Sequence, residues 1–367
     1  MTDQPDGETC VLVLQGGGAL GAYQAGVFEA LVAGGHMPTW IAGISIGAVN
    51  AALIAGNPPH RRLSALRAFW ERASSRVPFP SPFAEGWGRR LFNEAAAATV
   101  AMTGIPGFFR PRLTPPWLEL PGSPQAISLY DTAPLRETLE ELVDFDLLND
   151  GPVRFSVGAV NVLTGNFVYF DNRERRIGPE HVMASGALPP GFPPVMINGE
   201  PYWDGGIVSN TPLQQVLDQR GGDALLVFQV DLFSARGMMP RNLAEAAQRE
   251  KDIRFSSRTR LNTDLSKRIE ALEAAAARLA TRLPQDFAND PDLANLTAHE
   301  CDGPVTIVHL INRSEDYESQ GKDYEFSRMT VGGHWRSGKA DVERSLASPG
   351  WRQRVRPARG IVTLDLA

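Results

Sequence analysis

Cysteine is scarce in this chain: among 367 residues only Cys10 and Cys301 carry a thiol, and they lie far apart. Two distant cysteines outside any metal-ligand spacing provide neither a disulfide framework nor a metal site, so a reduced, cytoplasmic protein is the simplest interpretation. Long apolar runs are also missing, so the sequence predicts no membrane-spanning helix. The first residues, M-T-D-Q-P-D-G-E-T, are acidic and polar, unlike a secretory leader, and we expect no export.

An excess of basic residues is missing too. The chain has 36 Lys and Arg residues against 42 Asp and Glu residues, for a formal net charge of -6. This balance predicts no basic face, so we expect no nucleic-acid partner. The length is sufficient for one large α/β core with attachments. Evidence for function therefore has to come from local motifs.

The segment G-I-S-I-G, from Gly43 to Gly47, has the spacing of a nucleophile elbow. In such a turn a strand bends sharply into a helix, and glycines on either side of the serine let the backbone expose its hydroxyl. A short apolar strand precedes the motif, and a helix rich in small residues follows it. The alternative role of Ser45 is an ordinary helix N-cap. The flanking pattern favours Ser45 as a nucleophile.

A serine hydroxyl needs a base, and the segment D-G-G at Asp204 to Gly206 offers one. A carboxylate with a pKa near 4 is a weak base, but desolvation in an apolar cleft would raise that pKa. Trp203 precedes the aspartate and could shield it, while the glycines permit close approach of the backbone. The alternative is an ordinary Asp-Gly turn, which this dipeptide favours in isolation.

A glycine-rich segment, Q-G-G-G-A-L-G, runs from Gln15 to Gly21 between an apolar strand pattern and a helical pattern. Its backbone N–H groups could hold a developing oxyanion. Gly16, Gly18 and Gly21 also match a dinucleotide-binding fingerprint, which needs an acidic residue near the end of the next strand. The sequence A-G-I-S-I-G occupies that place, so an oxyanion loop is the favoured interpretation.

In this order, the three segments resemble the patatin family of lipid acyl hydrolases, over about residues 10–232. The stretches A-S-G-A-L-P-P-G-F-P-P-V and W-D-G-G-I-V-S-N-T-P, between Ala184 and Pro212, add to the resemblance. That family uses a Ser-Asp dyad without histidine. The resemblance implies that Ser45 is the nucleophile and Asp204 the base. It also implies an oxyanion hole at Gly16, Gly17 and Gly18, supported by the motif glycines Gly43, Gly47, Gly205 and Gly206.

Two features leave details of this chemistry open. Many relatives have Arg or Lys just before the last glycine of the loop, where this chain has Leu20. Leucine cannot attract an anionic head group, so the resemblance does not carry a preference for phospholipids. A Ser-Asp-His triad is the alternative mechanism, because hydrolases with an elbow usually place histidine after the acid. His334 is the best candidate, ahead of His299 and His309.

We predict a three-layer α/β/α domain over residues 8–232, with a largely parallel central sheet and the active site at the carboxyl ends of its strands. Residues 153–162 and 166–171 resemble a hairpin. Residues 76–126 alternate prolines with aromatics, which opposes long regular structure and suggests a packed surface loop or a cap over the acyl site. Residues 233–367 are expected to form a mainly helical extension packed on this domain. It should contain helices within 242–283, one further strand at 305–312, and a glycine-rich stretch before a last helix at 339–346.

These observations predict a serine lipid acyl hydrolase of esterase, lipase or phospholipase A type, acting on fatty-acyl esters without a metal or organic cofactor. The alternatives are an acyltransferase, thioesterase or polyester depolymerase with the same site, or a non-catalytic lipid-binding regulatory protein. We expect a lipid or other acyl-ester substrate and peripheral contact with the inner membrane face. The numerous Arg and Lys residues within 249–282 leave a lid, an oligomer contact and a membrane-surface helix as open roles for that region.

Overall fold

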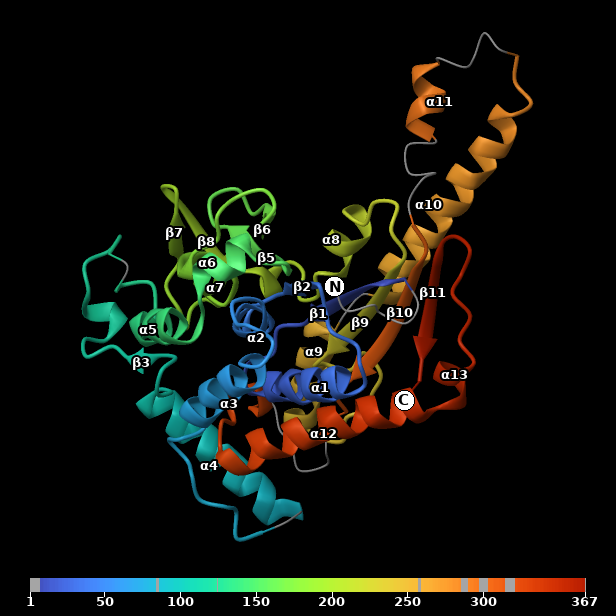
Figure 1. Ribbon diagram of the computed structural model, residues 1–367. Coiled ribbons are helices and arrows are strands. Elements are labelled where there is room, and N and C mark those ends of the chain that lie inside the picture. The colour runs from blue at the N-terminus through green and yellow to red at the C-terminus, as the bar shows by residue number, and fades with distance from the viewer. Residues whose placement is uncertain are drawn as a thin grey trace.

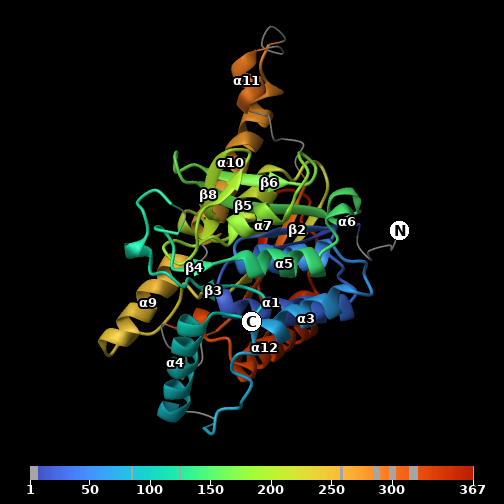
Figure 2. The same ribbon diagram turned by 90° about the vertical axis from the view of Figure 1, so that its left-hand side faces the viewer.

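The structure is a computed structural model that describes residues 7–83, 86–123, 125–256, 259–284, 290–296, 303–313 and 321–366. A mostly parallel sheet crosses the body, and helices cover both of its faces (Figure 1). An arm formed by α10 (Thr259–Ala280) and α11 (Pro291–Leu296) projects from the body in two perpendicular views (Figures 1 and 2). The predicted α/β class with a largely parallel sheet is confirmed.

Within the described residues the main sheet has nine strands in the order β11-β10-β9-β1-β2-β5-β8-β7, with β6 paired to β5. The strands from β11 to β5 run parallel, whereas β6 and β8 are antiparallel to β5 and β7 is antiparallel to β8. A separate short pair joins β3 and β4. The strands are β1 (Thr9–Leu14), β2 (Trp40–Gly43), β3 (Arg110–Pro111), β4 (Tyr130–Asp131), β5 (Arg154–Asn161), β6 (Phe167–Asp171), β7 (Val195–Ile197), β8 (Glu200–Asp204), β9 (Leu225–Asp231), β10 (Val305–Ile311) and β11 (Ile361–Asp365).

Alternation along β1 assigns its side chains to two separate cores, as the period of a strand requires. Val11 and Val13 join a cluster beneath α8 (Leu213–Asp218), whereas Leu12 and Leu14 join the larger cluster with α1 (Gly21–Ala33). Two cores on opposite faces define the three layers. The remaining helices are α2 (Ile46–Ala55), α3 (Arg62–Ala73), α4 (Gly86–Thr103), α5 (Ala133–Leu142), α6 (Phe145–Asp150), α7 (Pro179–Ser185), α9 (Leu243–Phe255), α12 (Arg328–Ala347) and α13 (Pro349–Arg352), with short 3-10 turns η1 (Gly18–Leu20), η2 (Pro116–Leu118), η3 (Gly205–Ile207) and η5 (Lys322–Tyr324).

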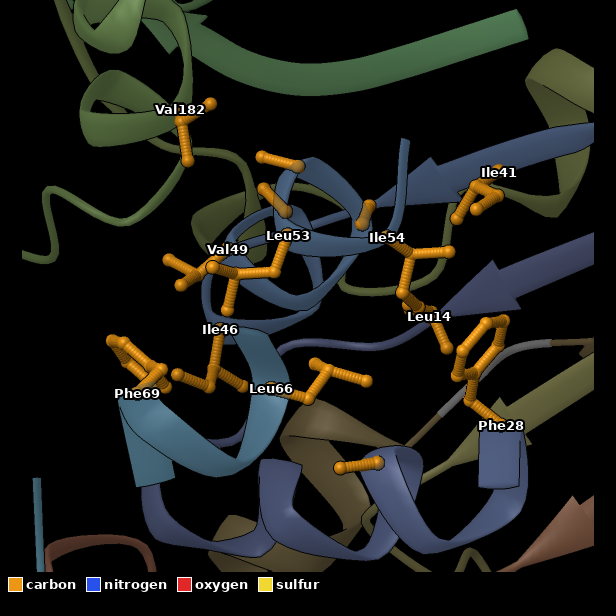
Figure 3. Close-up of a cluster of buried hydrophobic side chains, with 14 of the residues drawn as sticks. Leu14, Phe28, Ile41, Ile46, Val49, Leu53, Ile54, Leu66, Phe69 and Val182 are labelled. Atoms are coloured by element: carbon orange, nitrogen blue, oxygen red, sulfur yellow. The ribbon is translucent and has the colours of Figure 1, made fainter. Parts of the chain in front are cut away.

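Helix α2 is buried on every side, which is why its sequence is apolar without a polar face. Ile46, Val49 and Leu53 project from it into a cluster that also contains Leu66 and Phe69 of α3 (Figure 3). Each such large side chain, when fully buried, contributes about 1.5–3 kcal/mol relative to exposure. The helix that follows Ser45 is therefore held firmly by the core.

The predicted hairpin is confirmed: β5 and β6 pair antiparallel, with Ser156 opposite Asp171 and Val160 opposite Phe167. Gly165 adopts a positive φ of 70° in the turn between them, a conformation that favours glycine. The predicted helical region within 242–283 is confirmed as α9 and α10, which are separate helices.

The expectation of little regular structure in 76–126 is wrong for its middle part, where α4 runs for 18 residues. The prolines lie outside this helix, at Pro78, Pro80 and Pro82 before it and at Pro106 after it. A proline-free interval of this length is free to form a helix, so the alternation of prolines with aromatics limits only the flanks.

The predicted last helix begins much earlier than expected, because α12 starts at Arg328 and includes the glycine-rich stretch. Within this stretch, Gly338 serves close helix packing rather than a loop. A Cβ atom on Gly338 would clash with the carbonyl oxygen of Tyr23, and one on Gly26 would clash with that of Trp335. Glycine on both helices thus lets α1 and α12 pack backbone to backbone.

The expectation of one further strand beyond residue 232 was also incomplete. Both β10 and β11 extend the main sheet, and β10 pairs in parallel with β9 of the preceding region. The segment 361–365 is short and follows an irregular stretch, so its pattern alone gave no signal. The C-terminal residues therefore complete the sheet as well as covering it.

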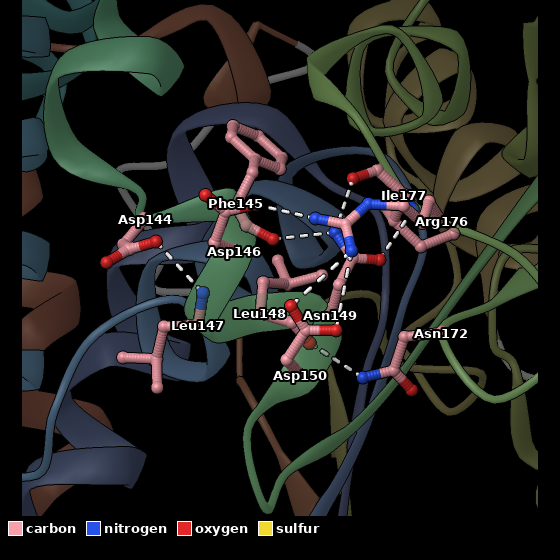
Figure 4. A network of polar contacts seen from close by, with 10 residues as sticks. All are labelled: Asp144, Phe145, Asp146, Leu147, Leu148, Asn149, Asp150, Asn172, Arg176 and Ile177. Atoms are coloured by element: carbon pink, nitrogen blue, oxygen red, sulfur yellow. Dashed lines mark hydrogen bonds and ion pairs between the residues drawn. The ribbon is translucent and has the colours of Figure 1, made fainter.

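A polar network fixes the segment that leads into α7 (Figure 4). Asn149 Nδ2 donates to the carbonyl oxygen of Ile177 (2.9 Å), and the N–H of Ile177 donates back to Asn149 Oδ1 (2.7 Å). Arg176 pairs with Asp146 (2.5 Å) and Asp150 (3.4 Å), but these exposed ion pairs contribute little. The reciprocal amide bonds therefore do more to position α7.

Candidate active site

Ser45 lies at the sharp turn between β2 and α2, with φ 55° and ψ -123°, outside the regions that non-glycine residues normally occupy. The flanking glycines are needed because the turn is crowded. A Cβ atom on Gly43 would clash with the backbone of Gly47, and one on Gly47 would clash with the carbonyl oxygen of Leu14. This is the geometry that a nucleophile elbow requires.

Ser185, at the end of α7, supports the elbow from a distant part of the chain. The N–H of Ser45 donates to Ser185 Oγ at 3.0 Å, and Ser185 is fully buried. Sequence reasoning did not single out Ser185. The only available signal was its place in the stretch A-S-G-A-L-P-P that carries part of the family resemblance.

Asp204 ends β8 and is 2% exposed. Its Oδ1 accepts from the N–H of Gly206 at 2.7 Å, and the carboxylate also accepts a hydrogen bond from the Ser45 hydroxyl. Burial raises the pKa of Asp204 to about 7, although the hydrogen bonds from Ser45 and Gly206 act to lower it. A Cβ atom on Gly205 would crowd the carbonyl oxygen of Gly158, so glycine allows the aspartate turn to lie against β5.

The glycine loop lies beside the elbow and is fixed by Asn210. The N–H of Gly16 donates to the carbonyl oxygen of Asn210 at 3.2 Å, and Asn210 Nδ2 donates to the carbonyl oxygen of Gly16 at 3.0 Å. Gly17 and Gly18 follow and line the pocket. Gly18 has a positive φ of 55°, and a Cβ atom there would clash with the carbonyl oxygen of Asp323.

Gln15 precedes these glycines, and both the nitrogen and the oxygen of its side-chain amide make hydrogen bonds that fix the loop. Its Nε2 donates to Thr211 Oγ1 (2.9 Å) and to the carbonyl oxygen of Phe255 (3.0 Å). Its Oε1 accepts from the N–H groups of Leu232 (2.6 Å) and Phe233 (3.0 Å). Such buried, satisfied networks rigidify what they join. Neither Gln15 nor Asn210 carries this role visibly in the sequence, because every partner of the two side chains is at least 45 residues away.

A pocket with about 650 Å³ of empty space, including its open mouth, contains the predicted site residues Ser45, Asp204, Gly206 and the loop Gly16–Gly18. Six of its eighteen lining residues are phenylalanines, which suits an apolar ligand. The remaining lining residues are Ile46, Phe108, Phe109, Gly186, Leu188, Phe192, Asn210, Phe233, Phe255, Asp323, Tyr324 and Phe326. Phe108 and Phe109 come from the 76–126 segment, so part of that segment reaches the pocket.

The C-terminal region supplies one wall of this pocket, through Phe255, Asp323, Tyr324 and Phe326. Lys251 Nζ pairs with Asp323 Oδ1 at 2.5 Å and lies 5.4 Å from the centre of the Tyr324 ring. Burial raises the pKa of Asp323, while Lys251 acts to lower it. The aspartate and the lysine therefore form a pair beside the glycine loop.

Of the histidines considered as triad members, His334 and His309 are not among the residues that line the pocket. His334 is buried in α12, and burial, aided by the positive charges of Lys322 and Arg89, lowers its pKa to about 4. His309 is buried in β10, and His299 lies outside the described residues. Leu20 is fully buried in the core and is not part of the pocket lining either.

In the described part of the chain, no cluster of three or more His, Cys, Asp or Glu side chains has the arrangement of a metal site. A search of the same residues found no helix with the length and apolar character needed to cross a bilayer.

A family model described as patatin-like phospholipase matches residues 12–217, and a second, described as patatin phospholipase, matches residues 253–358. Because the first match spans more than half of the chain, the chain belongs to the patatin-like phospholipase family. At the family level it is thus related to lipid acyl hydrolases. The crystal structure of VipD from Legionella pneumophila is 14% identical in sequence with a TM-score of 0.39, and the match covers 92% of this chain and 66% of that chain. No curated protein matches the chain.

Proposed function

We propose that the chain is a serine hydrolase that cleaves carboxylic esters of fatty acids through a Ser45–Asp204 dyad. The observation that carries this proposal is a buried carboxylate, with its pKa raised to about 7, that accepts a hydrogen bond from a serine held at an elbow. A carboxyl with a pKa near the working pH is ionised in a large fraction of molecules and is still basic enough to accept the serine proton. The apolar pocket around the pair supports a fatty-acyl substrate.

In the proposed first step, Ser45 Oγ attacks the ester carbonyl carbon while its proton passes to Asp204. The N–H groups of Gly17 and Gly18 stabilise the oxyanion. That of Gly16 is already committed to Asn210, so Gly16 shapes the loop instead. The C–O bond to the alcohol then breaks, Asp204 returns the proton to the leaving oxygen, and an acyl-serine remains.

In the second step, water attacks the acyl-serine as Asp204 accepts one of its protons. Collapse of the second tetrahedral intermediate releases the fatty acid and returns the proton to Ser45. The acyl chain would lie among the phenylalanines of the pocket, where its removal from water contributes about 0.8 kcal/mol per buried methylene. The proposal needs no group beyond the side chains and N–H groups named here.

A fluorophosphonate probe tests the proposal, because it reacts rapidly only with an activated serine. We expect stoichiometric labelling that peptide mass mapping assigns to Ser45, together with turnover of nitrophenyl acyl esters. Ser185→Ala is the matched control: its hydroxyl lies beside the elbow but should not be the labelled atom, so this variant should still be labelled at Ser45. A folded wild-type protein that neither reacts with the probe nor hydrolyses any acyl ester would instead indicate a lipid-binding protein.

A further inference from the structure

Helix α10 exposes a regular row of apolar side chains, here called the α10 stripe: Leu265, Ile269, Leu272, Ala276 and Leu279. The spacing is four, three, four and three residues, which is the alternation of a heptad repeat. Leu265 is 56% exposed, Leu272 63% and Leu279 59%. Leucines in such a row are rarely left in water along a whole helix face.

The body of the protein does not account for this stripe. Helix α11 and strand β11 contact α10, and among the described side chains of α10 the buried one is Ala277, on the outer side of the heptad relative to the stripe. The arm also projects away from the sheet in both views (Figures 1 and 2). The described residues of the chain therefore cover one side of α10 and leave the opposite, apolar side open.

The composition of the stripe indicates a helical partner in a two-stranded arrangement. With Leu265, Leu272 and Leu279 at d positions, Ile269 and Ala276 fall at a positions. A β-branched residue at a with leucine at d favours parallel two-stranded coiled coils. A helix lying on a membrane surface would instead present a broad apolar face bordered by basic residues, whereas Glu273 borders this narrow one.

Charges beside the stripe fit a second copy of the same helix. Arg268 takes a g position and Glu273 the following e position, five residues later, and Arg268 is exposed. In a parallel, in-register pair these two positions face each other across the interface. Two-fold symmetry would form the Arg268–Glu273 contact twice. The same sequence thus supplies both members of each pair.

We propose that two copies of this chain associate through α10 as a parallel coiled coil, with the α10 stripe as the seam. The interface lies on the arm, outside the pocket residues, so each copy keeps a complete catalytic site. Because the seam spans little more than two heptads, the dimer is expected to dissociate on dilution.

Sedimentation equilibrium of the full chain over a hundredfold concentration range tests this proposal. We expect a reversible monomer–dimer equilibrium that Leu272→Asp weakens at least about a hundredfold, because association would bury an unpaired carboxylate. Leu163→Asp is the matched control, since Leu163 is 77% exposed in the β5–β6 turn and lies off the stripe. It should leave the equilibrium unchanged, and both variants should retain ester hydrolysis. A monomer at every concentration, or a dimer that Leu272→Asp does not affect, would overturn the proposal.

Disulfide trapping tests the parallel register. In a Cys301→Ser background, Leu265→Cys and Leu279→Cys should each cross-link to the same position of a second copy. An antiparallel pair would allow self-cross-linking at no more than one of them, and that result would contradict the proposed register. The charges give a third measurement: Arg268→Glu should weaken dimerisation about tenfold, and the double variant Arg268→Glu/Glu273→Arg should restore it. Vesicle binding by a monomer, lost in Leu272→Asp, would assign the stripe to a membrane instead.

Discussion

The candidate active-site pocket buries a charged group, whereas the α10 arm exposes apolar groups. In the pocket, a carboxylate is removed from water, and the pKa of Asp204 rises to about 7 as a result. On the arm, large apolar side chains such as Leu272 stay in water. Each arrangement costs free energy in the isolated chain. In the pocket, the raised pKa makes Asp204 a stronger base. On the arm, association with a partner would bury the exposed apolar side chains and offset the cost of their exposure.

The two regions also differ in how they are held. The pocket is fixed by hydrogen bonds from distant segments: Gln15 reaches four partners, Asn210 holds the glycine loop, and Ser185 supports the elbow. The arm is a regular helix with one shorter helix packed beside it. Single changes in the pocket should therefore abolish chemistry, whereas changes on the arm should alter association and leave folding and activity intact.

The largest expected effect is that of Ser45→Ala, which removes the nucleophile. Its kcat for nitrophenyl esters should fall by about 10⁴-fold or more. The strained φ of 55° remains with alanine, so the melting temperature should change little. Circular dichroism and a thermal melt beside the assay establish that the variant is folded. Retention of more than a few per cent of wild-type kcat would contradict the elbow mechanism.

Asp204→Asn should lower kcat by about 10³-fold, because an amide cannot accept the serine proton. The matched comparison is His334→Gln, which removes the other proposed base while keeping a polar side chain. It should retain kcat within about threefold, since His334 lies outside the pocket lining. A folded His334→Gln variant as inactive as Asp204→Asn would support the triad.

The same substitution should make the protein more stable at alkaline pH. A carboxyl whose folded pKa is raised from 3.8 to about 7 contributes stability below pH 4 and loses it as the pH rises through 7. Asparagine cannot ionise, so it avoids that loss. Asp204→Asn should then gain roughly 1–4 kcal/mol at pH 8 and much less at pH 5. Urea unfolding at both pH values measures the difference, and an equal or reversed gain would show that burial does not dominate.

Activity should follow the ionisation of Asp204 directly. Since the carboxylate is the acting form, kcat/KM should fall about tenfold per pH unit below 7 and reach a plateau above it. A pH profile with a neutral substrate, which does not itself titrate, gives this pKa. A plateau that extends down to pH 5 would mean that the base titrates near its ordinary value.

The sequence predicted those features of the site whose residues are close together in the chain. The elbow glycines, the serine and the D-G-G turn are each contiguous, and crowding at Gly43 and Gly47 explains why these positions require glycine. The parallel strands were similarly visible as apolar runs. The residues that hold the site together were not, because the importance of Gln15 and Asn210 arises only when segments far apart in the chain meet.

Glycine also has two structural roles, in turns and in close helix packing, that a sequence pattern does not distinguish. Gly165 marks a turn with positive φ, as expected, but Gly338 lies within α12 and permits contact with α1. The first role depends on local backbone conformation, and the second depends on a partner more than 300 residues away. The contribution of Asp323 and Tyr324 to the pocket was missed for the same reason.

The smallest expected effect concerns head-group choice. Leu20 is fully buried, so Leu20→Arg would test folding rather than specificity. Lys251, a cation beside the pocket, is already paired with Asp323 at 2.5 Å. That pair is neutral overall, so neutral esters should match or exceed anionic phospholipids in kcat/KM. Asp323→Asn removes the carboxylate charge that pairs with the lysine and should shift the ratio toward anionic phospholipids by about tenfold, the size of one charge-assisted contact.

Lys251→Gln is the matched control, because it removes the cation that Asp323→Asn would expose. Alone it should change the ratio less than about threefold, and in the double variant with Asp323→Asn it should cancel the shift, as expected for two coupled groups. Competition between a glyceride and an anionic phospholipid in mixed micelles at fixed salt measures all four ratios. A strong wild-type preference for the anionic substrate that Lys251→Gln abolishes would show that the lysine binds head groups despite its partner.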